Sequence, residues 1–125
     1  MNRQYKTISI RGAVTVEENS GDTIKAATVE LLSNILNKNK IEQDDIISVI
    51  FTMTQDLTAE FPAKAARIDL GWDDISMLCA QEVAVPGSIP MCIRVLLTIN
   101  STLNKNEIRH VYLGNAKKLR PDLFQ

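Results

Sequence analysis

Hydrophobic and polar positions alternate with a period of two near the start of the chain. Over residues 5–11, Ile8 and Ile10 fall on one face, and Thr7, Ser9 and Arg11 fall on the other. This alternation predicts a strand with one buried face. Gly12 follows directly, and we expect it to break the strand, while Gly21 and its polar neighbours mark a loop.

The period then changes from two to between three and four, which is typical of a helix. One stripe collects the apolar side chains of this segment: Ile24, Ala27, Leu31, Leu32 and Ile35. The polar run 38–40 follows the last of them. The pattern therefore predicts an amphipathic helix over residues 23–37 whose apolar stripe packs against the core.

The remaining segments alternate between strand and short helix. Residues 46–53 form a nearly continuous apolar run rich in β-branched side chains, which predicts a strand covered on both faces. Pro62 suits the first turn of a short helix that runs to about Leu70, with Gly71 as its stop. Three more strands are predicted, over residues 75–80, 91–100 and 108–113.

This order of elements predicts one α/β domain over residues 1–125, with a mixed sheet, one long helix and one short helix. Two of the strands are apolar on both faces, but the single long helix can shield only one face of a sheet. The other face would leave a larger apolar patch than monomers usually expose. We therefore expect a homo-oligomer, unless loops and the C-terminal tail cover that face.

Composition narrows the function classes. The chain has 125 residues, 45% of them hydrophobic and 23% charged, and its formal net charge is −1. A core can form, but no basic stripe is available for nucleic acid. No apolar run approaches the roughly 20 residues of a membrane span, and the N-terminus lacks the apolar core of a signal peptide, so we expect a cytoplasmic protein.

Cysteine and histidine are too few for most familiar catalytic centres. Cys79 and Cys92 have the spacing of neither a disulfide framework nor a metal site, and His110 is the single histidine. A nucleophile activated by histidine would have to use that residue, which we interpret as structural or interfacial. We therefore expect no metal and no cofactor, and a chemistry that depends on charge and shape.

Arg94 is the most informative residue, because it interrupts the apolar run of residues 91–100. An unpaired charge out of water costs several kcal/mol. The side chain therefore either points to solvent from an edge strand or reaches into a cavity that takes an anion. Glu82 is its candidate partner within the protein, and Arg11, at the end of the first predicted strand, could border the same cleft.

Other candidates are weaker when taken singly. Lys64, Arg67 and Arg120 add positive charge but are each more typical of a surface. Tyr112 suits a core or a pocket equally well, and Phe61 and Leu119 are more typical of packing. Together with Arg94 and Arg11, these residues indicate a pocket for a small dianion, without naming a reaction.

Six local runs, in this order, carry a resemblance that covers nearly the whole chain. They are IRGAVTVE (10–17), FPAKAAR (61–67), CAQE (79–82), CIRV (92–95), RHVYL (109–113) and LRPDL (119–123). The set resembles the monofunctional chorismate mutases of the trimeric, AroH-type α/β class. The all-helical chorismate mutases have a different fold, and the chain does not resemble them.

The resemblance implies a homotrimer built as a pseudo-α/β barrel, with active sites in clefts between neighbouring subunits. It implies that chorismate is the substrate and that a [3,3] Claisen rearrangement converts it to prephenate, on the route to phenylalanine and tyrosine. The reaction is unimolecular and needs no metal, cofactor, proton transfer or covalent intermediate. Holding the substrate in a reactive conformation and stabilising the separating charge are then sufficient for catalysis.

The resemblance also assigns roles. Arg94 would donate to the ether oxygen and hold the side-arm carboxylate. Glu82 would accept from the ring hydroxyl and orient Arg94. Arg11 and Tyr112 would bind the side-arm carboxylate, and Cys79 would form a hydrogen bond near the ring hydroxyl.

Further residues would surround the substrate. The pocket wall would be formed by Phe61, Ala63 and Lys64, with Arg67 at the rim near the ring carboxylate. Residues 115–125 would form a tail in which Leu119 and Arg120 close over the ligand. Met77 and Leu78 stand where the family has a small β-branched pair with a threonine hydroxyl, so a hydrogen bond there would have to come from the backbone.

Two alternatives also use arginine, the first in the same arginine-lined cleft and the second at an interface between subunits. One is a non-catalytic trimeric protein that binds or senses a small dianionic metabolite. Glu82, together with Arg94, argues against a non-catalytic binding protein, because a protein that only binds a dianion gains little from a carboxylate in its pocket. The other is a small α/β trimer of the imine-deaminase kind, to which the six runs do not belong.

Overall fold

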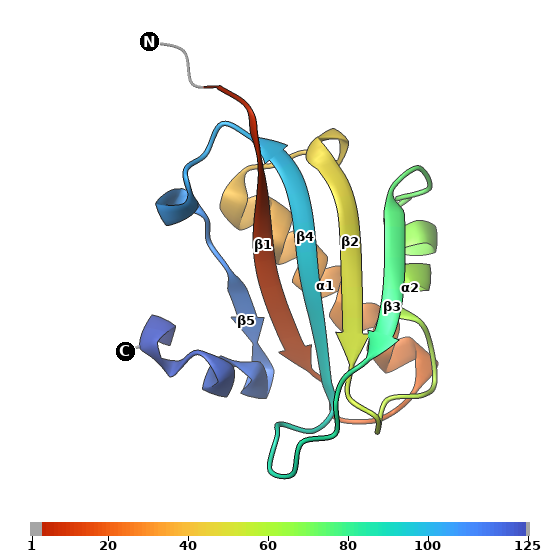
Figure 1. Ribbon diagram of the computed structural model, residues 1–125. Coiled ribbons are helices and arrows are strands. Elements are labelled where there is room, and N and C mark those ends of the chain that lie inside the picture. Colours follow the sequence, from red (N-terminus) through yellow and green to blue (C-terminus); the bar gives the residue numbers. More distant parts are fainter. Residues whose placement is uncertain (1–3, 125) are drawn as a thin grey trace.

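The computed structural model describes residues 4–124 and contains five strands and two α-helices (Figure 1). The strands are β1 (Lys6–Thr15), β2 (Ile46–Met53), β3 (Ser76–Gln81), β4 (Cys92–Ser101) and β5 (Val111–Leu113). The helices are α1 (Gly21–Asn39) and α2 (Pro62–Asp69). Four short 3₁₀ helices complete the fold: η1 (Gln43–Asp45), η2 (Lys105–Glu107), η3 (Gly114–Leu119) and η4 (Pro121–Phe124).

The strands form one mixed sheet in the order β3-β2-β4-β1-β5. β4 runs antiparallel to both β1 and β2, whereas the outer strands β3 and β5 are parallel to their neighbours. Both α-helices lie on the same face of the sheet, behind it in Figure 1, and the opposite face carries neither of them. The predicted α/β class, with a mixed sheet, one long helix and one short helix, is confirmed.

The core lies between this sheet and α1. Four of the five predicted stripe residues of α1 are fully buried, and Ala27 packs against them at the margin. The helix begins two residues earlier than predicted, because the Ser20 hydroxyl accepts a hydrogen bond from the backbone N–H of Thr23 at 3.1 Å. α2 ends as predicted, with Gly71 in a left-handed conformation just after it.

Gly12 does not break the first strand, and this prediction was wrong. β1 continues to Thr15, with Gly12 opposite Val95 of β4. A Cβ atom at Gly12 would lie 2.8 Å from Cδ1 of Ile35. The glycine therefore allows α1 to approach the middle of the sheet closely.

The last strand is shorter than predicted, because side chains replace the sheet ladder over residues 108–110. Asn39, at the end of α1, accepts from the backbone N–H of Arg109 at 2.7 Å and donates to its carbonyl at 2.9 Å. His110 accepts from the backbone N–H of Arg11 through Nδ1 at 2.9 Å. Only Val111–Leu113 then pair with β1.

The face without helices carries two rows of side chains across the strands. The first row contains, in order from β3 to β1, Leu78, Ile50, Leu96 and Arg11. The second contains Ala80, Thr52, Arg94, Ala13 and Tyr112. Within the single chain β2 is thus covered on one face only, and Ile50 remains 42% exposed on the other. No helix within residues 4–124 has the length and apolar character needed to cross a membrane.

Candidate active site

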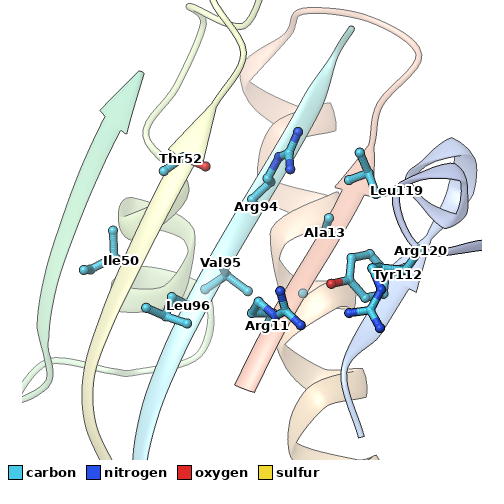
Figure 2. A pocket seen from close by; sticks show the side chains of 11 residues that line it. Arg11, Ala13, Ile50, Thr52, Arg94, Val95, Leu96, Tyr112, Leu119 and Arg120 are labelled. Carbon is cyan, nitrogen blue, oxygen red and sulfur yellow. The ribbon is translucent and has the colours of Figure 1, made fainter. Parts of the chain in front are cut away.

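A pocket of about 450 Å³ opens on the helix-free face of the sheet (Figure 2). Five of the residues singled out from the sequence line it: Arg11, Arg94, Tyr112, Leu119 and Arg120. They come from β1, β4, β5 and the 3₁₀ segment at the C-terminus. Its three arginines make the pocket strongly cationic, so it suits an anionic ligand.

Arg94 and Glu82 form the electrostatic centre of the site. Nε of Arg94 lies 3.0 Å from Oε2 of Glu82, and the Thr52 hydroxyl donates to the same oxygen at 2.7 Å. The Nε–H is buried but is not aligned with Glu82, and it has no hydrogen-bond partner within residues 4–124. This arrangement orients the guanidinium without satisfying its Nε–H, which is typical of a group that binds a ligand.

Arg11 and Tyr112 lie at the opposite side of the pocket (Figure 2). The backbone N–H of Arg11 donates to Nδ1 of His110, and this hydrogen bond fixes the main chain at Arg11. Burial, and then the positive charges of Arg11 and Arg120, lower the pKa of His110. The ring is therefore neutral at pH 7 and accepts the Arg11 N–H.

The tail contributes Leu119 and Arg120 to the pocket rim. Arg120 donates to both carboxylate oxygens of Asp122, from Nε at 3.1 Å and from Nη2 at 2.9 Å. This pairing raises the pKa of Arg120 and lowers that of Asp122. Asp122 is exposed and Arg120 is half-buried, so the pair orients Arg120 more than it stabilises the fold.

Phe61 and Cys79 lie elsewhere in the chain. They line a second pocket of about 370 Å³ between the end of β3 and the loop that precedes α2. Burial raises the pKa of the Cys79 thiol, despite a hydrogen bond from the backbone of Ala63. Cys79 therefore remains a neutral thiol near pH 7 and is available for hydrogen bonding.

The other predicted wall residues lie on α2 and β3 and line neither of these two pockets. Lys64 pairs with Glu60 at 3.4 Å, and Arg67 is exposed on α2. Met77 packs against the core, whereas Leu78 is 69% exposed on the helix-free face. The single chain thus separates most of the predicted site residues into two groups. The arginine group lines the first pocket and contains Arg11, Arg94, Tyr112, Leu119 and Arg120. The β3–α2 group contains Phe61, Ala63, Lys64, Arg67 and Cys79, of which Phe61 and Cys79 line the second pocket.

The sequence analysis did not single out Thr52. The available signal was that Thr52 and Ser48 are the two hydroxyl side chains of the apolar run 46–53, both in step with Ile50. The small and apolar side chains that shape the pocket floor were also missed: Ala13, Ile50, Val95 and Leu96. Nothing in their residue types distinguishes them from ordinary core positions.

Comparisons with known proteins agree with this geometry. The family model described as chorismate mutase type I matches residues 7–123. The chain is 50% identical over 115 residues to a protein named chorismate mutase AroH from Thermus thermophilus, covering 91% of this chain and 93% of that protein. It is 41% identical over 114 residues to chorismate mutase AroH of Bacillus subtilis, covering 91% and 90%.

A solved structure agrees as well. The chorismate mutase from Clostridium thermocellum superposes with a TM-score of 0.87 at 50% identity, covering 89% of this chain and 98% of that one. The match of the family model to nearly the whole sequence, the two relatives and the shared fold lead to one conclusion. The chain belongs to the chorismate mutase type I family.

Proposed function

We propose that this chorismate mutase rearranges chorismate to prephenate in the arginine-lined pocket, with Arg94 as the principal catalytic residue. Enzymes of this family are isomerases of aromatic amino acid biosynthesis. The rearrangement breaks the ether C–O bond of chorismate while a new C–C bond forms between the methylene carbon of the enolpyruvyl arm and the ring carbon that bears the carboxylate. As the C–O bond breaks, negative charge grows on the ether oxygen and positive charge on the ring.

The charges around the pocket suit both sides of this separation. Arg94 would donate to the ether oxygen and stabilise its growing charge more strongly in the transition state than in bound chorismate. Glu82, held by Thr52 at 2.7 Å, would accept from the ring hydroxyl on the side that becomes positive. Arg11, Tyr112 and Arg120 would bind the side-arm carboxylate and restrict the arm to a reactive conformation.

We propose further that the working enzyme is a cytoplasmic homotrimer with its sites between subunits. The arginine group lines one pocket of the chain, and Phe61 and Cys79 of the β3–α2 group line a separate one. A neighbouring subunit would bring its own Cys79, Phe61, Ala63, Lys64 and Arg67 to the arginine group. Exposed Leu78 and Ile50 would be buried by the same association.

Within this assembly, residues 115–125 would form a cap over the substrate. Residue 125 of this cap lies outside the residues that the structure describes. Residues 1–3 of the proposed single domain, 1–125, also lie outside them. Leu119 and Arg120 border the arginine pocket from the C-terminal segment, which supports this role. No metal or other cofactor is required, because the reaction transfers no electron or group between molecules.

The observation that carries the proposal is the buried Arg94 Nε–H, held 3.0 Å from Glu82 yet without a hydrogen-bond partner in the described chain. Replacing the charge tests it. Arg94→Gln should lower kcat by about 10²-fold or more, the usual cost of losing one donor to a developing oxyanion. The loss of chorismate absorbance in the ultraviolet gives kcat and KM, and NMR identifies prephenate.

Arg109→Gln is the matched control, because this arginine is exposed and its recorded contacts are made by its backbone. It should retain the kcat of the unmodified protein. A raised KM with unchanged kcat in Arg94→Gln would mean that Arg94 only binds substrate, and the proposed mechanism would be wrong.

A further inference from the structure

Asp56 holds an unusual backbone turn at the start of β4. Both carboxylate oxygens of Asp56 accept from the backbone N–H of Met91, Oδ1 at 3.2 Å and Oδ2 at 3.0 Å. Met91 has a φ of 54°, in the left-handed region that a side chain with a Cβ adopts only at a cost. Within residues 4–124, the only other non-glycine residue with a positive φ is Lys40, at the end of α1.

The same contact belongs to a compact network that joins the ends of β2 and β4. The Thr54 hydroxyl donates to Oδ1 of Asp56 at 2.5 Å, and its oxygen accepts from the backbone N–H of Cys92 at 3.0 Å. The Thr54 N–H donates to the Cys92 carbonyl at 3.1 Å. Val16 donates to the carbonyl of Met91 at 2.9 Å, so three segments meet at this turn.

This network lies next to both charged groups at the centre of the site. Arg94 is two residues beyond Cys92 on the same strand and pairs with Thr52 of β2 across the sheet. Glu82 donates its backbone N–H to the carbonyl of Met53 at 2.8 Å. The segment from Thr52 to Asp56 therefore holds Glu82 on one side and the start of β4 on the other.

We propose that Asp56 is a positioning residue for catalysis: by holding Met91 in the left-handed conformation, it fixes the register and direction of β4 and so places Arg94 against Glu82 and the substrate. This inference rests on the proposed role of Arg94. Asp56 does not line the arginine pocket, so its effect on the reaction passes through the backbone. Its side chain belongs to an exposed residue, and exposed hydrogen bonds add little to global stability.

A double-mutant cycle with Met91→Gly tests this link, because glycine adopts a positive φ without the Cβ penalty and needs no carboxylate to hold it. Asp56→Ala should lower kcat by about tenfold, since a displacement of about 1 Å at a reacting group can cost up to about 10²-fold. KM should change much less than kcat. In the Met91→Gly background, the same Asp56→Ala change should lower kcat by less than about twofold.

The single variant Met91→Gly measures the effect of removing the methionine side chain and its packing. Thermal unfolding of all four proteins of the cycle measures stability separately from kcat. Asp45→Asn is the matched control. Asp45 is half-buried, and its carboxylate accepts from the backbone N–H of Glu42 at 2.9 Å, just before the opposite end of β2. Its replacement should leave kcat unchanged. Should Asp56→Ala fail to fold, Asp56→Asn enters the same cycle.

Two results would overturn the inference: an unchanged kcat in the Asp56 variant, or an equal loss of kcat in both backgrounds. The second would mean that Asp56 acts by a route that does not involve the Met91 conformation. The proposed role of Arg94 is tested separately by Arg94→Gln. If that role is wrong, Arg94→Gln retains the kcat of the unmodified protein, whatever the Asp56–Met91 cycle shows.

Discussion

At the scale of single residues, the site depends on an ion pair that is oriented but leaves one buried hydrogen-bond donor unsatisfied. Glu82 lies beside Arg94 and also accepts from Thr52, so the carboxylate has a fixed position, while the Arg94 Nε–H has no partner in the described chain. If the Arg94–Glu82 salt bridge were fully hydrogen-bonded, Glu82 would occupy the Arg94 donor and compete with the substrate for it. The incomplete pairing leaves the guanidinium preorganised for a developing negative charge.

His110 provides a prediction at the same scale. Its pKa is lowered below 6.5 by burial and by the charges of Arg11 and Arg120, and its Nδ1 must be unprotonated to accept the Arg11 N–H. The unfolded chain therefore binds a proton first, and stability should fall as the pH decreases from about 6.5 towards the lower pKa of the folded state. Above about 6.5 this contribution should be constant.

Thermal unfolding at pH 7.5 and 5.5 measures this effect. His110→Asn keeps an acceptor but does not titrate, so its Tm should change less across this interval than that of the unmodified protein. Glu60 and Asp122, whose pKa values are also lowered, lose their contributions below about 4.5 and do not interfere. Equal changes in Tm would show that His110 is not the group responsible.

At the scale of elements, the contact between β1 and α1 sets the depth of the core. Gly12→Ala would bring a Cβ within 2.8 Å of Cδ1 of Ile35 and 3.2 Å of the Val111 carbonyl. We expect a loss of about 1–3 kcal/mol in the free energy of unfolding, as for other overpacked sites, measured by urea denaturation. A loss below about 0.5 kcal/mol would mean that α1 shifts freely.

Gly21→Ala is the control for this substitution. Gly21 is the first residue of α1, and an added Cβ would meet only Oε2 of Glu60, at 4.0 Å. The change should be neutral or stabilising by up to about 1 kcal/mol, because alanine restricts the unfolded chain. The pair therefore separates the close helix–sheet contact from the general effect of replacing glycine.

At the scale of the whole molecule, the helix-free face is the surface that association would cover. Leu78 is 69% exposed in the first cross-strand row. Leu78→Glu should weaken the proposed trimer, because a charge would have to be buried in its interface. Light scattering coupled to size-exclusion chromatography should give about three times the 13.9 kDa of the chain for the unmodified protein, and a lower mass for the variant at the same concentration.

Ile68→Glu is the matched control, since Ile68 is 60% exposed but lies on α2, on the covered side of the sheet. It should keep the trimeric mass. A monomeric mass for the unmodified protein would contradict the trimer, and would require the two pockets of one chain to act separately.

The sequence alone determined the elements and the principal charges. Periodicity is a local property, so the stripe of α1 and the alternation in β1 follow from neighbouring residues. Arg94 was recognisable because a charge within an apolar strand needs a partner, and Glu82 was the partner available nearby. The six ordered runs then indicated the family before any contact was known.

Only the tertiary structure decided which contacts and hydrogen bonds form between segments that are distant in the sequence. The local sequence predicts that Gly12 breaks the strand. In the structure, the missing side chain of Gly12 allows Ile35 of α1 to pack closely against the sheet. Asn39 and His110 bind the backbone of other segments and shorten β5. The roles of Thr52 and Asp56 depend on hydrogen bonds to residues 30 and 35 positions away, and such contacts arise only when the sheet brings the ends of β2, β3 and β4 together.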